Sequence, residues 1–242
     1  MIRLLVFGGS GSIGRGVLEA ASADSRITET RALQRRADPR PLPRVTVIPV
    51  ADFTNLTLQN AAFDDVDACI FALGTSQYSV DAAEYRRITV DFTLAAARQL
   101  AARSPHAAFV FVSGGGADPT GKSAILFARV KGEAEVLLRD VGVGRLVVAR
   151  PGGIITPNAR RSAERWFQPL AHLLEPFAKG LVIRASELGV ALIRAGLESD
   201  VLPLLENRDL RALARRGSDH GASGPPKQSD PQPHRRIRDE GT

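Results

Sequence analysis

The chain has 242 residues, of which 44% are hydrophobic and 24% charged, a composition that excludes a wholly disordered protein and predicts one main folded domain. Its formal net charge of +6 would suit a nucleic-acid partner. However, no basic patch interleaved with aromatic residues, no Cys/His finger and no recognition-helix pattern accompanies that charge. Nucleic-acid binding is therefore not expected.

The single cysteine, Cys69, excludes an internal disulfide and lies in the apolar run DACIFALG, which favours a buried strand thiol in a reducing cytoplasm. The N-terminal MIRLLVFGGSGSIG reaches its glycines too soon for a secretory signal. No later apolar run is long enough to span a bilayer. We expect a cytoplasmic protein without a membrane segment.

Short β-branched or apolar runs alternate with longer Ala- and Leu-rich stretches of helical period, which is the pattern of βαβ units around a parallel sheet. We expect strands near residues 2–7, 28–33, 45–49, 66–73, 107–113 and 144–150. Helices are expected over about 13–23, 80–103 and 123–141. The predicted fold class is α/β: a doubly wound, mostly parallel Rossmann sheet with helices on both faces and its ligand at the carboxyl ends of the strands.

The pattern changes after Pro151, where large apolar residues around Trp166 recur at helical spacing, interrupted by prolines. We expect a small C-terminal substrate or lid region over about 152–185, and a helix that only covers the edge of the sheet is the alternative. Residues 181–198 predict a short strand and a helix capped by Ser186, and 201–216 a last strand and helix. Residues 217–242, rich in Pro, Gly, Ser and charge, predict a disordered tail.

The most informative motif is VFGGSGSIGRG at residues 6–16. Its glycines fit both G-x-x-G-x-x-G and, through Gly9, G-x-G-x-x-G. One glycine makes the tight strand-to-helix turn, another lets backbone N–H groups approach a pyrophosphate, and the third permits close helix packing at a helix N-terminus that favours phosphate. A purely structural glycine turn is the alternative. The predicted dinucleotide-binding positions here are Gly8, Ser10, Gly11, Ser12, Ile13 and Gly14.

The end of the next strand predicts which dinucleotide binds. About twenty residues after the glycines, an acidic residue would hold the adenosine ribose 2′-hydroxyl of NAD, but this strand ends in Gln34, Arg35 and Arg36. A guanidinium can pair bidentately with the extra phosphate of NADP. The prediction is NADP in preference to NAD, with the two arginines as solvated loop charges the alternative.

Seven segments, taken in order, resemble one family: FGGSGSIGRG, QRR, VADF, FDDVDACIFALGTS, FVSGGGAD, FARVKGEAE and VVARPGGII. They are similar to atypical short-chain dehydrogenase/reductases, with the nearest resemblance to the Tat-interacting-protein-like oxidoreductases, over about residues 1–210. The resemblance implies a single NAD(P)-binding Rossmann domain there. It also implies that Asp52 and Phe53 lie beside the adenine and that Ala72, Leu73 and Gly74 pass under the adenosine ribose. Without it, Asp52 is a helix cap and Gly74 a strand end.

The same resemblance bears on catalysis. The family has Tyr-x-x-x-Lys on this helix, where the lysine binds the nicotinamide ribose and lowers the pKa of the tyrosine. Lys131 matches the lysine, but Phe127 stands at the tyrosine position and has no proton to give. The alternative for Lys131 is a solvated helix charge paired with Glu135 at i,i+4. The family commonly has a serine pair on the preceding strand, where this chain has Ser113 followed by glycines, so Ser113 and Lys131 are the candidate catalytic residues.

Other chemistries find no support in the sequence. The four histidines are scattered without metal-ligand spacing, and no hydrolase elbow or Walker-type phosphate loop is present. The two tyrosines, Tyr78 and Tyr85, follow the fourth strand and are expected to pack or to lie on the surface, although either is a conceivable substitute donor.

Two functions follow from these observations. The first is an NADP-dependent oxidoreductase that lacks the usual tyrosine and acts on a small molecule, a quinone or a carbonyl compound. The second is a non-catalytic NADP(H)-binding sensor or interaction module with a protein partner.

Overall fold

The computed structural model describes residues 1–36, 40–156 and 181–216. Seven strands form one sheet in the order β3-β2-β1-β4-β5-β6-β9, and every pair of neighbours is parallel. The strands are β1 (Ile2–Phe7), β2 (Ile27–Gln34), β3 (Val45–Pro49), β4 (Ala68–Phe71), β5 (Ala108–Val112), β6 (Arg145–Arg150) and β9 (Leu204–Glu206). The order reverses between β1 and β4, which confirms the doubly wound Rossmann prediction.

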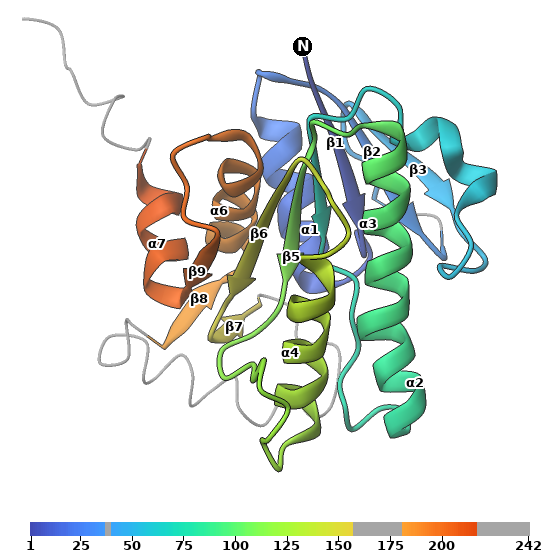
Figure 1. Ribbon diagram of the computed structural model, residues 1–242. Coiled ribbons are helices and arrows are strands. Elements are labelled where there is room, and N and C mark those ends of the chain that lie inside the picture. Colours follow the sequence, from blue (N-terminus) through green and yellow to red (C-terminus); the bar gives the residue numbers. More distant parts are fainter. Residues whose placement is uncertain (37–39, 157–180, 217–242) are drawn as a thin grey trace, which may run out of the picture.

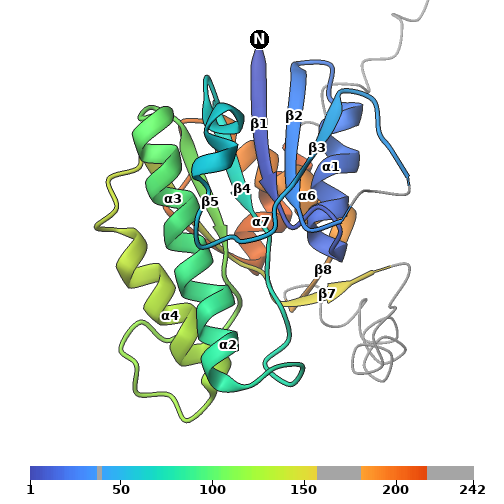
Figure 2. The same ribbon diagram turned by 90° about the vertical axis from the view of Figure 1, so that its right-hand side faces the viewer.

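Helices cover both faces of this sheet (Figures 1 and 2). One face carries α1 (Ser12–Ala23), α6 (Ala185–Leu197) and α7 (Asn207–Arg215). The other carries α3 (Phe92–Arg103) and α4 (Leu126–Leu138). Successive strand residues alternate between these two cores, as Leu4 and Val6 face α1 while Leu5 and Phe7 face α3. Both faces are buried, which explains the continuous apolar runs in the strands.

The remaining connections differ in detail from the prediction. The helix expected over 80–103 is one continuous path made of α2 (Ala82–Arg86), a π-helical turn (Arg87–Asp91) and α3. A 3-10 helix (Thr57–Phe63) follows β3, and a parallel two-stranded ribbon, β7 (Gly153–Ile155) with β8 (Val182–Arg184), follows β6. The expected substrate or lid region therefore begins and ends on this ribbon, but residues 157–180 and the expected tail at 217–242 lie outside the described residues.

Two boundary predictions are wrong. Ser186 does not cap α6, because β8 runs directly into the helix, Ala185 is already helical and Arg184 is the N-cap. The first turn is instead supported by Glu187, whose carboxylate accepts the Arg184 N–H at 3.4 Å. The strand expected over 66–73 is limited to Ala68–Phe71, since the chain turns under the glycine loop after Phe71.

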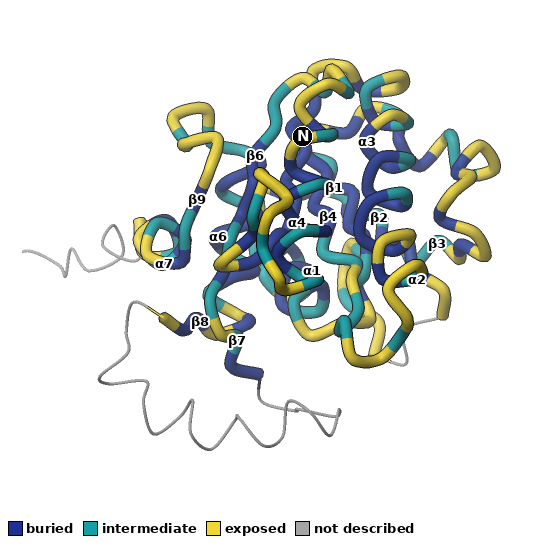
Figure 3. The backbone as a smooth tube through the Cα atoms, turned by 60° about the horizontal axis from the view of Figure 1, so that its bottom comes forward, coloured by how far each residue is buried: buried dark blue, intermediate teal, exposed yellow. Residues whose placement is uncertain are grey.

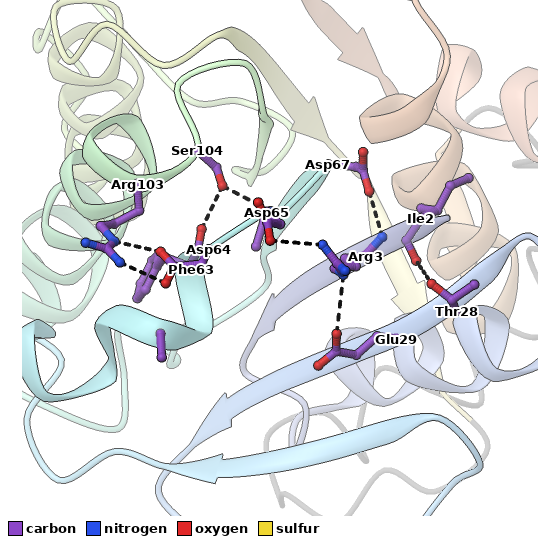
Figure 4. A network of polar contacts seen from close by, with 12 residues as sticks. Ile2, Arg3, Thr28, Glu29, Phe63, Asp64, Asp65, Asp67, Arg103 and Ser104 are labelled. Carbon is purple, nitrogen blue, oxygen red and sulfur yellow. Dashed lines mark hydrogen bonds and ion pairs between the residues drawn. The ribbon is translucent and has the colours of Figure 1, made fainter.

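The amino edge of the sheet is held by ion pairs (Figure 4). The backbone N–H of Arg3 donates to Asp67 at 2.7 Å, and its guanidinium lies 3.2 Å from the Asp65 carboxylate. Arg103 binds Asp64 through two hydrogen bonds of 2.7 and 2.8 Å. A hollow of about 370 Å³ lies here, but its charged groups pair with one another, and a doubly wound sheet binds its ligand at the opposite edge.

The carboxyl edge is the other end of the strands and points downward in Figure 1. Figure 3 turns this edge toward the viewer and shows exposed loop segments around buried strands. In the parts of the chain that the structure describes, no helix is both long and apolar enough to cross a membrane.

Candidate functional site: a dinucleotide cradle at the carboxyl edge

The glycine loop joins β1 to α1 and is packed too tightly for side chains. Gly8 has φ +82°, and a Cβ there would lie 2.7 Å from the backbone N and Cα of Leu73. A Cβ on Gly14 would overlap the carbonyl oxygen of Gly8, which accepts the Gly11 N–H at 2.9 Å. Leu73 and Ala72 therefore lie directly against the loop. Gly74 follows them into open space, where a Cβ would meet no atom within 4 Å.

The N-terminus of α1 has no side-chain cap. Gly11 is the N-cap, and no side chain caps the helix and no acidic residue stands in its first turn. The first intrahelical bond runs from Arg15 N–H to Gly11 O at 2.8 Å, so the N–H groups of the preceding turn, at Ser12 and Ile13, have no helical acceptor. Ser10, Gly11 and Ser12 are exposed. These free donors at the positive end of a helix fit a pyrophosphate.

The end of β2 borders the loop and carries no carboxylate. Gln34 is buried, with its Oε1 against Gly9 and without a hydrogen-bond donor. Its Nε2 donates to the carbonyl oxygen of Arg36 at 2.7 Å, which fixes the first residues after the strand. Arg35 and Arg36 are both exposed, and the Arg35 guanidinium lies 6.0 Å from the ring centre of Phe53. Two cations thus flank the loop where NAD-binding proteins place an acid.

Phe53 lies near Arg35, and it differs in exposure from its neighbour Asp52. Asp52 is exposed, and its carboxylate accepts the Thr54 N–H at 2.9 Å. It stabilises a local turn rather than capping the 3-10 helix, which begins only at Thr57. The Phe53 ring packs in the core, 5.6 Å from Phe92. Any contact of Phe53 with an adenine would therefore use its backbone.

Lys131 is buried, which contradicts the alternative of a solvated charge paired with Glu135. Its Nζ donates to the carbonyl oxygen of Val112 at 2.9 Å and lies 4.9 Å from the ring centre of Phe111. Burial lowers the pKa of Lys131 to about 8, and the negative charge of Glu135 partly opposes that shift. The ammonium is thus held at the end of β5 and is close to neutralisation at physiological pH.

Ser113 belongs to a second buried polar group that the sequence did not reveal. Its hydroxyl donates to Glu135 at 2.5 Å, and Arg150 at the end of β6 binds the same carboxylate at 2.5 and 2.9 Å. Glu135 is 1% exposed. The network joins β5, α4 and β6 directly beneath the carboxyl edge and fixes Ser113. The sequence KGEAE showed only that Glu135 lies on a helix at i,i+4 from Lys131, a spacing that suits an ion pair. It gave no sign that Glu135 would pair with Arg150.

Gly114 and Phe127 are in direct contact. A Cβ on Gly114 would lie less than 3.0 Å from Cζ of Phe127, 3.2 Å from Cε2 and 3.4 Å from Cε1. The phenyl ring therefore occupies the space that a side chain at position 114 would need. Neither position offers a hydroxyl. This contact explains why residue 114 in the glycine run after Ser113 is a glycine. Residue 116 is a glycine because its backbone has φ +85°, which side-chain-bearing residues rarely adopt.

The two tyrosines and the single cysteine lie as the sequence predicted. Tyr85 is 1% exposed and packs in the core, whereas Tyr78 is 85% exposed, so the expectation of packing or surface positions is confirmed. Cys69 is buried as predicted, and its burial raises the pKa of the thiol well above its ordinary value. No cluster of three metal-ligating side chains occurs within residues 1–36, 40–156 and 181–216.

Comparisons with known proteins agree with this geometry. Residues 8–196 match the NAD(P)H-binding family. Protein HTATIP2 of Rattus norvegicus is 26% identical over 223 residues, which cover 88% of this chain and 89% of that protein. The mitochondrial protein fmp52 of Emericella nidulans is 27% identical over 211 residues, covering 82% of this chain and 89% of the relative.

Solved structures share the fold. The Bordetella bronchiseptica enzyme WbmF in complex with NAD⁺ superimposes with a TM-score of 0.62 at 14% identity, covering 93% of this chain and 80% of that one. Vestitone reductase from alfalfa gives a TM-score of 0.61 at 18% identity, with 84% and 75% covered. Because the family match spans most of the chain and begins in the glycine loop, the chain belongs to the NAD(P)H-binding family and is an atypical short-chain dehydrogenase/reductase.

Proposed function

We propose that the protein is an NADP-dependent oxidoreductase in which the bound dinucleotide supplies the hydride. The observation that carries the proposal is the uncapped N-terminus of α1, fitted into a glycine loop and flanked by two exposed arginines. The backbone N–H groups of Ser12 and Ile13 would hold the pyrophosphate. Residues 1–210 would act as one NAD(P)-binding unit, with the substrate region over about 152–185.

The preference for NADP rests on the charge at the end of β2. The strand is followed by Arg35 and Arg36 where an NAD site would have an acidic residue to hold the ribose 2′-hydroxyl. A carboxylate at that position would repel the 2′-phosphate of NADP, whereas the arginines attract it. Gln34 keeps the two arginines next to the loop through its bond to the Arg36 carbonyl oxygen. Asp52 and the Phe53 backbone would border the adenine, while Ala72, Leu73 and Gly74 would pass under the adenosine ribose.

Lys131 would bind the nicotinamide ribose, for which it has an ammonium already fixed at the end of β5. Ser113 is the remaining hydroxyl at this strand end, and Glu135 orients it. Phe127 stands at the position of the family's tyrosine and donates no proton. General-acid assistance is typically worth a factor of about 10² to 10⁴ in rate, so the favoured acceptor is one that does not need it.

A quinone meets this requirement better than an unconjugated ketone. Hydride transfer to a quinone leaves a hydroquinone anion, which is a stabilised phenolate and takes its proton from water. The same transfer to a ketone leaves an alkoxide, a much stronger base that requires an acid in the site. A small-molecule quinone is therefore the first substrate class to test, and carbonyl compounds are the second. The proposed compartment is the cytoplasm.

The contact of Phe127 with Gly114 also favours a second candidate function. The family's tyrosine position and the position after Ser113 both lack a hydroxyl and pack against each other, as expected of a non-catalytic NADP(H)-binding sensor that presents one conformation to a protein partner. Such a protein responds to its ligand only if the ligand prefers one conformation.

The test is equilibrium binding of NADPH and NADH to the purified chain at fixed ionic strength, with Arg35→Ala and, as a matched control, Arg208→Ala on α7. We expect NADPH to bind more tightly than NADH, and Arg35→Ala to reduce that preference by about tenfold, the value of one charge-assisted contact. Arg208→Ala should leave it unchanged. Equal affinities for both dinucleotides in the wild type would contradict the NADP proposal. Consumption of NADPH in the presence of a quinone would favour the enzyme, whereas binding of NADPH without consumption would favour the sensor.

A further inference from the structure

The segment between β4 and α2 is attached to the start of α4. The Phe127 N–H donates to Oε1 of Gln77 at 2.8 Å. The next residue, Tyr78, is in a turn closed by a hydrogen bond of 3.0 Å from Ser79 N–H to Ser76 O. Its own N–H donates to the Ser76 hydroxyl at 3.3 Å. Because neighbouring Cα atoms are about 3.8 Å apart, Tyr78 lies immediately beside the contact with Phe127.

Two large side chains of this region are exposed to solvent. Tyr78 is 85% exposed, and Ile125, two residues before Phe127, is 57% exposed. Single exposed apolar residues are ordinary. These two, however, stand on the two segments that the Gln77–Phe127 hydrogen bond joins, each within two residues of that bond. An aromatic ring and an aliphatic group left open beside a hydroxyl-free part of a site are suited to a flat apolar ligand.

We propose that Tyr78 determines substrate specificity by stacking on a planar quinone, with Ile125 completing the apolar wall. This inference rests on the proposed function, since the quinone must receive hydride from bound NADPH. In that step the C–H bond of the dihydronicotinamide breaks and its electron pair passes with the hydrogen to the quinone. NADPH, quinone and one proton from water give NADP⁺ and hydroquinone. Tyr78 takes no part in the proton transfer, and its ring provides the contact.

The experiment measures steady-state oxidation of NADPH by 1,4-naphthoquinone with the full chain. We expect Tyr78→Ala to raise KM for the quinone by about three- to tenfold, which corresponds to one aromatic pair, with a smaller change in kcat and an unchanged Kd for NADPH. Tyr78→Phe should stay within about twofold of the wild type, because it keeps the ring. Leu58→Ala, which removes another exposed side chain, is the matched control and should change nothing.

The outcomes separate the inference from the function on which it rests. An unchanged KM in Tyr78→Ala overturns the stacking role, and so does a Tyr78→Phe variant as impaired as Tyr78→Ala, since the phenol would then be a proton donor. Binding of naphthoquinone to the NADP⁺ complex is measured separately and requires no turnover. If that complex binds no quinone, the inference fails; if the chain binds no NADPH, the proposed function fails first.

Discussion

Replacement of Gly114 by alanine tests whether Gly114 and Phe127 are packed as one unit. The added methyl group would lie less than 3.0 Å from Cζ of Phe127 and 3.2 Å from Cε2, so the ring must move. Overpacking of this kind destabilises a protein by about 1–3 kcal/mol. Phe127 is only half-buried and the ring meets the methyl group with its free end. We therefore expect the free energy of unfolding to fall by about 1–2 kcal/mol.

The assay is a double-mutant cycle measured by urea unfolding. Phe127→Leu removes the part of the ring that meets position 114, so Gly114→Ala in that background should be nearly neutral. The expected coupling energy is about 1 kcal/mol, within the usual range for residues in contact. Gly74→Ala serves as the control because its methyl group would meet no atom within 4 Å. Equal effects of Gly114→Ala in the two backgrounds would refute the packing argument.

The same geometry limits what Phe127→Tyr can achieve. The phenol oxygen would be attached at Cζ, the ring atom closest to the Cβ direction of Gly114. The hydroxyl would therefore point at the backbone of residue 114 instead of at a substrate, unless the ring turns. We expect Phe127→Tyr alone to give less carbonyl reductase activity than the factor of about 10² to 10⁴ that a placed general acid provides.

Four further results are expected. Gly14→Ala should weaken NADPH binding at least tenfold, because its methyl group would overlap the backbone carbonyl of Gly8 and open the loop; calorimetric titration measures this, and unchanged binding would contradict the role given to the loop. Glu135→Gln should lower the free energy of unfolding by about 3 kcal/mol, since it leaves the Arg150 guanidinium without its buried anion; a urea midpoint equal to that of the wild type would exclude a strong pair. NADPH affinity should fall as pH rises through about 8, where Lys131 loses its proton, and Lys131→Met should show no such step. The free energy of unfolding should change with pH in the opposite direction to NADPH affinity. Between pH 8 and 10.5 the unfolded chain keeps the Lys131 proton that the native state has lost, so the stability of the wild type should rise with pH relative to that of Lys131→Met.

Local chemistry made the cofactor side of the fold predictable. The glycine loop, the helix that follows it and the strand ending in Gln34 all lie within the first 36 residues, and each has its own sequence signal. Strand positions followed from apolar runs because both faces of the sheet are buried. The end of β4 was less predictable, since Ala72 and Leu73 continue the apolar run but pack against Gly8 outside the ladder. Ser186 failed as a cap because its residue type suits a cap while the position is already inside the helix.

The surroundings of the candidate catalytic residues Ser113 and Lys131 depend on contacts between segments distant in the sequence. Spacing showed that Lys131 and Glu135 share a helix face, but it could not show that each has a better partner elsewhere. Lys131 binds the carbonyl oxygen of Val112, and Glu135 binds Ser113 and Arg150, which come from two other strands. In the low dielectric of the interior, a carboxylate is stable only with such partners. Tertiary structure therefore decided the pairing.

The lack of a hydroxyl at positions 114 and 127 concerns two residues that contact each other. From the sequence, Phe127 and Gly114 are two separate departures from a family pattern. In the structure, the ring of Phe127 fills the space above Gly114, so the two departures support each other and neither reverts without strain. Packing that leaves positions 114 and 127 without a hydroxyl supports the proposed chemistry, which needs none there. This packing supports the proposal of an acceptor whose reduced anion is stable without an acid, bound beside the exposed ring of Tyr78.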